Sequence, residues 1–297
     1  MFQNYLKIAW RSLLKDRQFT FLNLVGLSTG LACALFIWLW VSDELNVDRY
    51  NEKDKQLYEV MQNIKHDGII ETTTNTAGLL ANALSKEIAE IEYSATVVQA
   101  SWFDNDGIIN SGDKRIKARR QFVSRHYFDV FTCPFIEGDK NKILSDKHSI
   151  AISDVLARKL FHSTSDAVGK ILFWSDGEFT GSYQIAGVFA ANPVNATNQF
   201  DMIFNFDLFV EKRPGMKEWG NSDPSTFVIL RKGTNLDKFN AKIKDFVTRQ
   251  GKEDTKSLFA IKFSDKYLHD VYKDGKPTGS GRIAYVKLFT IIGIFIL

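Results

Sequence analysis

The chain has 297 residues, of which 44% are hydrophobic and 25% charged, values near the average for globular proteins. Two cysteines are too few for a disulfide framework. Of the 38 basic and 35 acidic residues, four and one lie in residues 1–18, so the remaining 34 and 34 cancel. Such a neutral body lacks the basic surface of a nucleic-acid-binding protein, and we expect no nucleic acid among its partners.

Residues 1–18 have the pattern of an amphipathic helix. Within residues 2–15, apolar side chains recur at helical spacing on one face and polar side chains occupy the other. We expect a cytoplasmic helix that lies on the inner leaflet with its cations toward membrane lipid. Packing on other transmembrane segments is an alternative compatible with this one. The cations are Lys7, Arg11, Lys15 and Arg17.

Residues 19–41 contain no charged side chain and are long enough to cross a bilayer as a helix. At about 1.5 Å per residue they reach roughly 35 Å, against a hydrocarbon core of about 30 Å. The basic residues precede this run and acidic residues follow it, which predicts a cytoplasmic N-terminus. A cleaved signal peptide would have a shorter apolar core. Trp38 and Trp40 near the end of the run are typical of an interfacial aromatic anchor.

The elements after this run mix hairpins with helices. Residues 57–71 predict a hairpin, because apolar side chains alternate and Asp67-Gly68 supplies the turn. Helices are predicted at 79–88, at 153–161 with Ser153 or Asp154 as the N-cap, and at 236–247 with Asn235 as the N-cap. Strands are predicted at 97–102, 116–122, 170–174, 183–189, 226–230 and 258–263.

This irregular order favours an α+β fold over a parallel doubly wound sheet. We expect an extracytoplasmic α+β domain at residues 43–283, built of two subdomains and flanked by transmembrane α-helices. The sequence closes on LFTIIGIFIL, which spans only about 15 Å as a helix. We expect residues 284–297 to be the start of a second transmembrane helix that is cut short. A short buried strand or helix ending the domain is the alternative.

Gly26, Ser28 and Gly30 match the G-x-S-x-G pattern of a nucleophile elbow. That elbow needs a strand before it and a helix after it, whereas this serine lies inside an apolar run. The same residues match G-x-x-x-G, in which small residues let two membrane helices approach closely. We therefore expect helix packing here, and no catalytic residue.

No nucleotide, cofactor or metal motif is complete. The glycines at 279 and 281 lie in a polar loop without a preceding strand, and the glycines at 107 and 112 lack the Lys-Ser/Thr of a Walker A loop. The five histidines show no metal-ligand spacing. We expect this chain to hold no cofactor or metal. An anchored enzyme is disfavoured for the same reason.

Several stretches occur in an order typical of one family. They are YLKIAWRSLLKDRQFTFLNLVGLSTGL, DELNVDRYNEKDKQLYEV, FVSRHYFDVFTCPFIEGD, IAISDVLARKLF with VGKIL, YQIAGVFAANPVNATNQFD and YLHDVYKDG. In these the chain resembles the MacB/FtsX-like ABC transporter permeases over essentially all of its length. One departure is Ala167, where family members often have proline.

The resemblance implies a non-catalytic permease subunit of the bacterial inner membrane, with a MacB-like periplasmic core domain at 43–283. Such subunits work with a separate cytoplasmic ABC ATPase, which binds the ATP, and with a second permease copy or homologue. A periplasmic or outer-membrane partner is a further option. ATP-driven motion would reach the outer domain and serve the export or release of a peptide, lipoprotein or similar substrate. A membrane-bound sensor receptor with an extracytoplasmic ligand-binding domain is the alternative.

Overall fold

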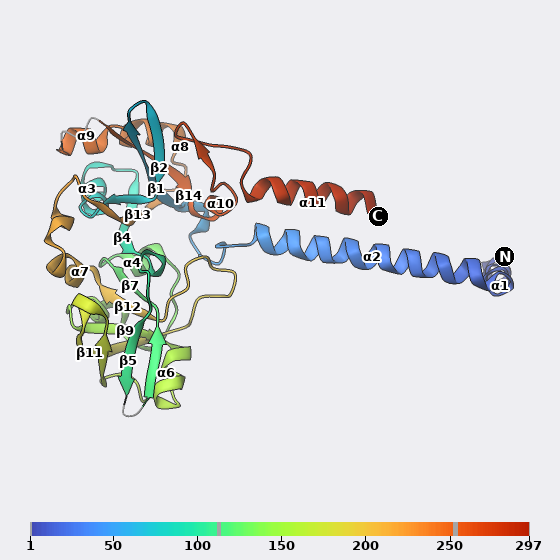
Figure 1. The fold of residues 1–297 in the computed structure, drawn as a ribbon, viewed down its shortest axis with the longest axis horizontal. Coiled ribbons are helices and arrows are strands. Elements are labelled where there is room, and N and C mark those ends of the chain that lie inside the picture. Colours follow the sequence, from blue (N-terminus) through green and yellow to red (C-terminus); the bar gives the residue numbers. More distant parts are fainter. Residues whose placement is uncertain (1, 112–113, 252–254, 297) are drawn as a thin grey trace. The chain divides into compact units, whose positions relative to one another are not determined.

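The computed structural model describes residues 2–111, 114–251 and 255–296. The chain forms two compact units. The first consists of its two ends, up to Asn46 and from Gly279, and the second is Val47–Thr278. Figure 1 shows the first as helices and the second as a mixed domain of helices and strands.

The first unit contains α1 Phe2–Lys15, α2 Arg17–Leu45 and α11 Arg282–Ile296. Among the described residues, α2 is the one helix long and apolar enough to cross a membrane. It extends the predicted 19–41 at both ends, because the polar residues that flank the apolar run keep the helical backbone up to the cap at Asn46. Helix α11 packs along α2 (Figure 1).

The second unit is built on one mixed sheet. Its strand order is β14-β1-β13-β4-β7-β12-β9-β11-β10-β5-β6, with β2, β3 and β8 attached to β1, β13 and β11. Only the β9–β11 and β7–β12 pairs are parallel among those that the structure describes. The strands are β1 Leu57–His66, β2 Ile69–Thr73, β3 Asn75–Ala77, β4 Ile91–Val98, β5 Gly107–Ser111, β6 Lys114–Ala118, β7 Arg120–Val123, β8 Phe135–Gly138, β9 Ser149–Ser153, β10 Ile171–Ser175, β11 Gly181–Phe189, β12 Met202–Asn205, β13 Ser222–Leu230 and β14 Lys256–Lys262, with the separate hairpin β15 Tyr272–Lys273 and β16 Lys276–Pro277.

Short helices cover this sheet. They are α3 Leu80–Glu87, α4 Tyr127–Val130, α5 Lys140–Ile143, α6 Asp154–Phe161, α7 Phe206–Lys212, α8 Leu236–Ile243, α9 Phe246–Gly251 and α10 Phe263–Lys266, with single 3-10 turns at Asp54–Gln56, Ala100–Trp102, Gly177–Phe179 and Pro214–Lys217. The unit is therefore an α+β domain, as the sequence predicts.

The sheet joins two lobes. We call β14, β1, β13 and β4 with α3, α8 and α9 the β1 lobe, and β12, β9, β11, β10, β5 and β6 with α6 and α7 the β11 lobe; they occupy opposite ends of the domain in Figure 1. The β1 lobe has a core around Leu80 and Phe239, and the β11 lobe one around Trp174 and Phe204. A third cluster, which includes Phe131, lies over the middle of the sheet. The two predicted subdomains thus share one sheet.

Local turn and cap chemistry explains the elements that the sequence predicts well. Asp67 and Gly68 both have positive φ, 47° and 84°, which is the geometry of a tight hairpin turn. The Ser153 hydroxyl accepts the Leu156 N–H at 3.2 Å, and the Asn235 side chain accepts the Lys238 N–H at 3.0 Å. Each of these bonds satisfies an amide in the first turn of its helix.

Tertiary contacts divide two predicted elements. The predicted strand 116–122 is split into β6 and β7, because the N–H of Arg119 turns to the Asp201 carboxylate at 2.8 Å. The predicted helix 236–247 is split into α8 and α9, since the carbonyl of Lys244 accepts the N–H of Leu258 in β14. No glycine or proline lies at either interruption, so the sequence does not indicate where these elements break.

Two predicted strands have wrong bounds. The strand predicted at 97–102 is β4 Ile91–Val98, and Ala100–Trp102 is a 3-10 turn. The helix predicted at 79–88 is confirmed as Leu80–Glu87, with Leu79 and Ile88 as its cap residues. The strand predicted at 258–263 ends at Lys262, because Phe263 begins α10.

We expect Gly107→Ala to destabilise the outer domain strongly. A Cβ at Gly107 would overlap the indole of Trp174, which is fully buried. Overpacking of this kind costs about 1–3 kcal/mol, measurable as a lower free energy of unfolding in urea. Gly181→Ala is the matched control, because its added methyl group would lie 3.6 Å from Tyr183, an ordinary contact. Equal stability of both variants would contradict this packing.

Candidate functional site

The first candidate site is the contact between α2 and α11. A Cβ at Gly293 would lie 3.2 Å from Cγ2 of Ile37, and one at Gly30 would lie 3.8 Å from Cγ2 of Ile296. The rings of Trp40 and Phe289 meet edge to face with centroids 4.9 Å apart. Glycines in both helices therefore face the partner helix. Gly293 was not among the predicted packing residues, because its only signal in the sequence is a small residue in the apolar run.

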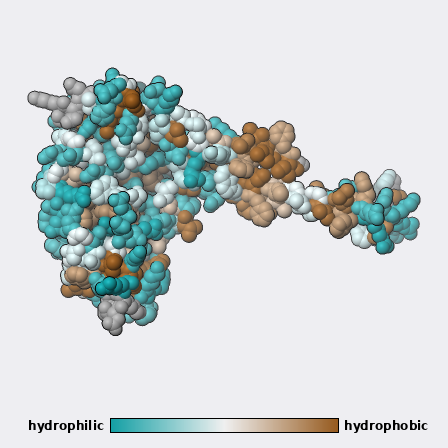
Figure 2. Space-filling view, viewed as in Figure 1, coloured by the Kyte–Doolittle hydropathy of each residue, from teal (hydrophilic) through white to brown (hydrophobic). Residues whose placement is uncertain are grey.

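Arg282 and Glu44 form an ion pair at the polar end of these helices. The Arg282 Nη1 lies 3.5 Å from Oε1 of Glu44. Figure 2 shows apolar surface gathered along this unit, which includes the exposed side chains of Phe21, Leu31 and Phe36. An exposed apolar surface of this extent is typical of helices that contact lipid.

The other predicted site residues of the first unit are spread along it. A Cβ at Gly26 would meet nothing within 4 Å. The Ser28 hydroxyl donates to the carbonyl of Leu24 at 2.6 Å, within its own helix. The indole of Trp38 is exposed. Lys7, Arg11, Lys15 and Arg17 are exposed as well.

The second candidate site is a buried charge cluster in the second unit. Glu59 of β1 is fully buried, and the Lys266 Nζ lies 2.7 Å from its Oε2. Burial raises the pKa of Glu59 above its ordinary value, and the charge of Lys266 opposes that rise. Lys266 also acts electrostatically on Asp48, whose pKa burial likewise raises. One cation thus compensates two buried carboxyl groups.

The charge cluster joins three parts of the chain. Asp48, which follows α2 in sequence, has a left-handed backbone with φ 59°. Its carboxylate accepts the N–H of Thr197 at 2.8 Å and the Thr197 hydroxyl at 2.6 Å. Lys266 ends α10, on the segment that leads to α11, and Glu59 lies in the sheet. Residues on the segments that follow α2 and lead to α11 therefore act electrostatically on the same buried cluster at β1.

A second ion pair also joins a lysine late in the unit to a carboxylate near β1. Lys262 at the end of β14 lies 3.0 Å from Asp54 of the 3-10 turn that precedes β1. Neither pair could be predicted from the sequence, because the partners lie far apart in the chain. The available signal was Glu59 itself, a carboxylate between the apolar residues Tyr58 and Val60 in the first half of the predicted hairpin.

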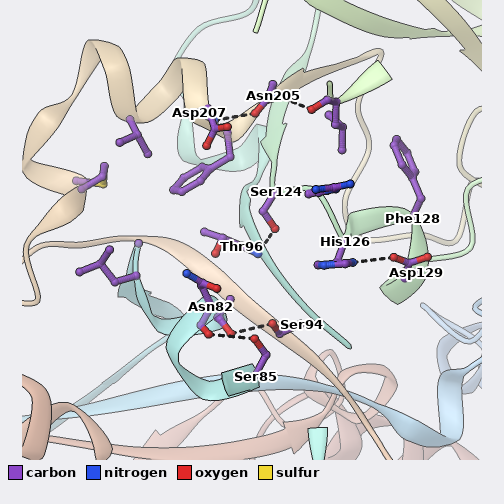
Figure 3. Close-up of a pocket in the computed structure, with 18 of the residues that line it drawn as sticks. Asn82, Ser85, Ser94, Thr96, Ser124, His126, Phe128, Asp129, Asn205 and Asp207 are labelled. Carbon is purple, nitrogen blue, oxygen red and sulfur yellow. Dashed lines mark hydrogen bonds and ion pairs between the residues drawn. The ribbon is translucent and has the colours of Figure 1, made fainter. Parts of the chain in front are cut away.

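The third candidate site is a cleft of about 920 Å³ between the two lobes (Figure 3). Asn82 and Ser85 of α3 lie on one side of it, and His126 and Asp129 lie on another, their ion pair being 2.9 Å long. Asp207 of α7 forms part of a further wall. The cleft is thus built from both lobes and from the strands that join them.

Hydrogen bonds hold the walls of this cleft in place. The Ser94 hydroxyl donates to the carbonyl of Ala81 at 2.8 Å, which ties β4 to α3. The Asn205 amide group donates to the carbonyl of Leu144 at 2.9 Å, and its oxygen caps α7. Among the residues that the structure describes, no group of three or more His, Cys, Asp or Glu side chains is placed to hold a metal ion.

Comparisons with solved structures identify the fold. A domain of a protein assigned as a permease from Porphyromonas gingivalis matches with TM-score 0.62 and 19% identity, over 73% of this chain and 93% of that one. The periplasmic region of MacB from Actinobacillus actinomycetemcomitans matches with TM-score 0.51 and 16% identity, over 72% and 91%. The extracellular domain of the noncanonic ABC-type transporter YknZ from Gram-positive bacteria matches with TM-score 0.50 and 14% identity, over 69% and 99%.

A sequence search of curated proteins finds no match. The family model of the MacB-like periplasmic core domain, however, matches residues 20–246, which is more than half of the chain and includes most of α2 and the second unit up to Phe246. The chain therefore belongs to the family of proteins with a MacB-like periplasmic core domain.

Proposed function

We propose that the chain is part of a permease subunit of an ABC transporter that works with a separate cytoplasmic ATPase. The observation that carries this proposal is the family match, which runs from the apolar helix into the outer domain. The subunit itself has no catalytic role: it transmits ATP-driven motion to the outer domain. Export or release of a peptide, lipoprotein or similar substrate is the activity that this motion would serve.

Charge supports the orientation of this subunit. The basic residues of α1 and the start of α2 precede the apolar run, and Asp43 and Glu44 follow it. An excess of Lys and Arg marks the cytoplasmic side of a span. The N-terminus is then cytoplasmic, and Val47–Thr278 lies outside the bacterial inner membrane. Gly30 serves packing against α11, whereas Gly26 and Ser28 serve packing against a further helix. Trp38 and Trp40 anchor the interface, and the four cations of α1 and α2 contact lipid headgroups.

The charge cluster supports transmission of motion. A buried carboxylate cannot leave its cation without a large desolvation cost, so Glu59 and Lys266 move together. Since Asp48 follows α2 and Lys266 precedes α11, displacement of either helix end is passed to β1 instead of being absorbed in a loose linker. A second permease copy and a periplasmic or outer-membrane protein remain proposed partners. A sensor receptor would share this topology, but the family match favours the permease.

We expect the full-length gene product to co-purify with a cytoplasmic ABC ATPase and to change its rate of ATP hydrolysis after reconstitution in nanodiscs. Spin labels at Lys86 and Glu211, which lie in different lobes, should report a new distance distribution when ATP is bound. Both side chains are exposed, so the labels leave the cores intact. A protein that never associates with an ATPase would refute the permease assignment. Association with an unchanged label distance would refute transmission alone.

We expect Lys266→Met to destabilise the outer domain by about 3 kcal/mol at neutral pH, because Glu59 is left buried without its cation. The folded-state pKa of Glu59 rises further, so the folded chain keeps a proton that the unfolded chain loses above the ordinary pKa of 4.5. The free energy of unfolding should therefore fall as pH increases, by up to about 1.4 kcal/mol per pH unit.

Two controls accompany this variant. Adding Glu59→Gln should abolish the extra pH dependence, and Lys147→Met should leave stability unchanged, since the Lys147–Glu211 pair is exposed. Urea unfolding measured between pH 5 and 8 decides the matter. A Lys266→Met protein whose stability follows that of the wild type across this range would show that the pair is not coupled.

We expect Gly293→Leu to separate α2 from α11, because the added side chain would meet Ile37. The measurement is disulfide cross-linking between cysteines placed at Trp40 and Phe289, in a background lacking Cys33 and Cys133. Gly26→Leu is the control, since its added Cβ meets nothing within 4 Å. Cross-linking that survives Gly293→Leu would contradict the glycine contact.

A further inference from the structure

The loop that joins β11 to β12 contains a tight turn at residues 193–196. The N–H of Ala196 donates to the carbonyl of Pro193 at 3.0 Å, which is the bond that closes a β-turn. The Gln199 side chain donates to the same carbonyl at 2.7 Å and to the carbonyl of Ala196 at 2.9 Å. The turn therefore has a fixed shape, although it belongs to neither a helix nor a strand.

Val194 lies at the tip of this turn, and its side chain is fully exposed. Turn positions are usually taken by Gly, Pro, Asn, Asp or Ser, whereas valine favours strands. Residues 190–200 also contain no charged side chain. A single exposed apolar side chain needs no explanation by itself, so the argument depends on where this one is held.

The turn is bonded to the chain segment that leaves α2. The Asp48 N–H donates to the carbonyl of Asn195 at 3.2 Å. The Asp48 carboxylate accepts the N–H and the hydroxyl of Thr197, as described above. Asn195 follows Val194 directly in the chain. The tip of the turn is therefore held beside Asp48.

Chain length limits how far this turn can lie from the membrane. The apolar run ends at Val41, α2 continues to Leu45, and Asp48 follows three residues later. Four helical residues advance about 6 Å, and three further residues advance at most about 11 Å. The headgroup layer on each side of the hydrocarbon core is itself about 5–8 Å thick. Where α2 spans a bilayer, the turn at residues 193–196 is thus held close to the headgroups.

We propose that this turn contacts the outer leaflet of the membrane, with the Val194 side chain at the boundary between headgroups and acyl chains. The side chain leaves water there, which is favourable for apolar surface. Because residues 190–200 carry no charge, no ionised side chain of this stretch has to be desolvated. The inference rests on the proposed topology, in which α2 spans the membrane and the second unit lies outside it.

Lipid suits this surface better than a second protein copy does. A stable protein interface buries at least about 1,000 Å², far more than the tip of one turn can supply. A lipid contact needs no such area, because α2 already holds the chain at the membrane and the second contact is intramolecular in effect. The turn would give the second unit a point of support on the membrane besides its covalent connections.

The test uses the full chain in phosphatidylcholine nanodiscs, with a nitroxide label on one cysteine in a background lacking Cys33 and Cys133. Power-saturation electron paramagnetic resonance compares collisions of the label with oxygen, which concentrates in lipid, and with a water-soluble nickel chelate. The label on Val194→Cys should collide preferentially with oxygen. Ile171→Cys is the matched control, because Ile171 is an exposed apolar residue of the second unit in β10, and its label should collide preferentially with nickel.

A label on Phe36→Cys reports separately on α2, since Phe36 is exposed within the apolar run. Oxygen preference at Phe36 together with nickel preference at Val194 would overturn the inference and leave the permease assignment intact. Nickel preference at Phe36 would refute the membrane span on which both depend. A label at Val194 that is protected from both reagents would show that protein covers the turn, and would also overturn the inference.

The role of the valine side chain has its own readout, with the label moved to Pro193→Cys. Pro193 is exposed, and its carbonyl, which takes part in the turn, is kept in cysteine. Adding Val194→Asp should shift the collisions of this label severalfold from oxygen toward nickel, because a carboxylate resists leaving water. Val194→Leu should preserve the oxygen preference. Equal accessibility in these two variants would show that the side chain at position 194 does not hold the turn against lipid.

Discussion

The burial of Glu59 is the constraint on which much of the outer domain depends. A carboxylate in the interior requires a cation, and Lys266 supplies it at 2.7 Å. That requirement fixes α10 against β1, and the same cation acts electrostatically on Asp48, which follows α2 in the sequence. Nearby Asp48 holds the loop at Thr197. An apolar pair of equal volume would pack as well, but would not oblige these segments to move as one.

The single sheet is extensively paired within the β1 lobe but leaves a cleft between the two lobes. In the β1 lobe, β1 and β14 pair over seven residues and β4 and β13 over six. This end of the sheet is therefore held by extensive strand pairing. The β11 lobe has its own core around Trp174. Between them, β7 is short, and the space beyond its end becomes the cleft. The cleft is thus a direct result of where one strand stops.

Features set by local chemistry could be predicted from the sequence. The turn at Asp67-Gly68, the caps at Ser153 and Asn235, and the apolar run of α2 each depend on residues close together in the chain. The α+β fold was predicted from the irregular order of local strand and helix patterns, and the family resemblance likewise depends on the order of local stretches.

What could not be predicted depends on contacts between distant residues. The break at Arg119 requires Asp201, and the break after Ile243 requires the backbone of Leu258. The charge pair and the cleft are assembled from elements throughout the domain, and neither has a motif. Gly30 was predicted to pack against another helix, but only the fold identifies that helix as α11, whose Gly293 in turn faces α2.

The short pairing of β4 with β7 also bears on how the domain can evolve. Two residue pairs supply few backbone hydrogen bonds between β4 and β7. The two lobes are therefore held together mainly by side chains of the central cluster, among them Phe131, Val123 and Phe227. Close-packed interiors register the gain or loss of even one methylene group. Substitutions in this central cluster, which lies between the lobes, would therefore alter the angle between them. The same substitutions within the core of one lobe would change only the stability of that lobe. Related proteins could therefore change the shape of the cleft by substitutions in the central cluster, without changing a residue that lines the cleft.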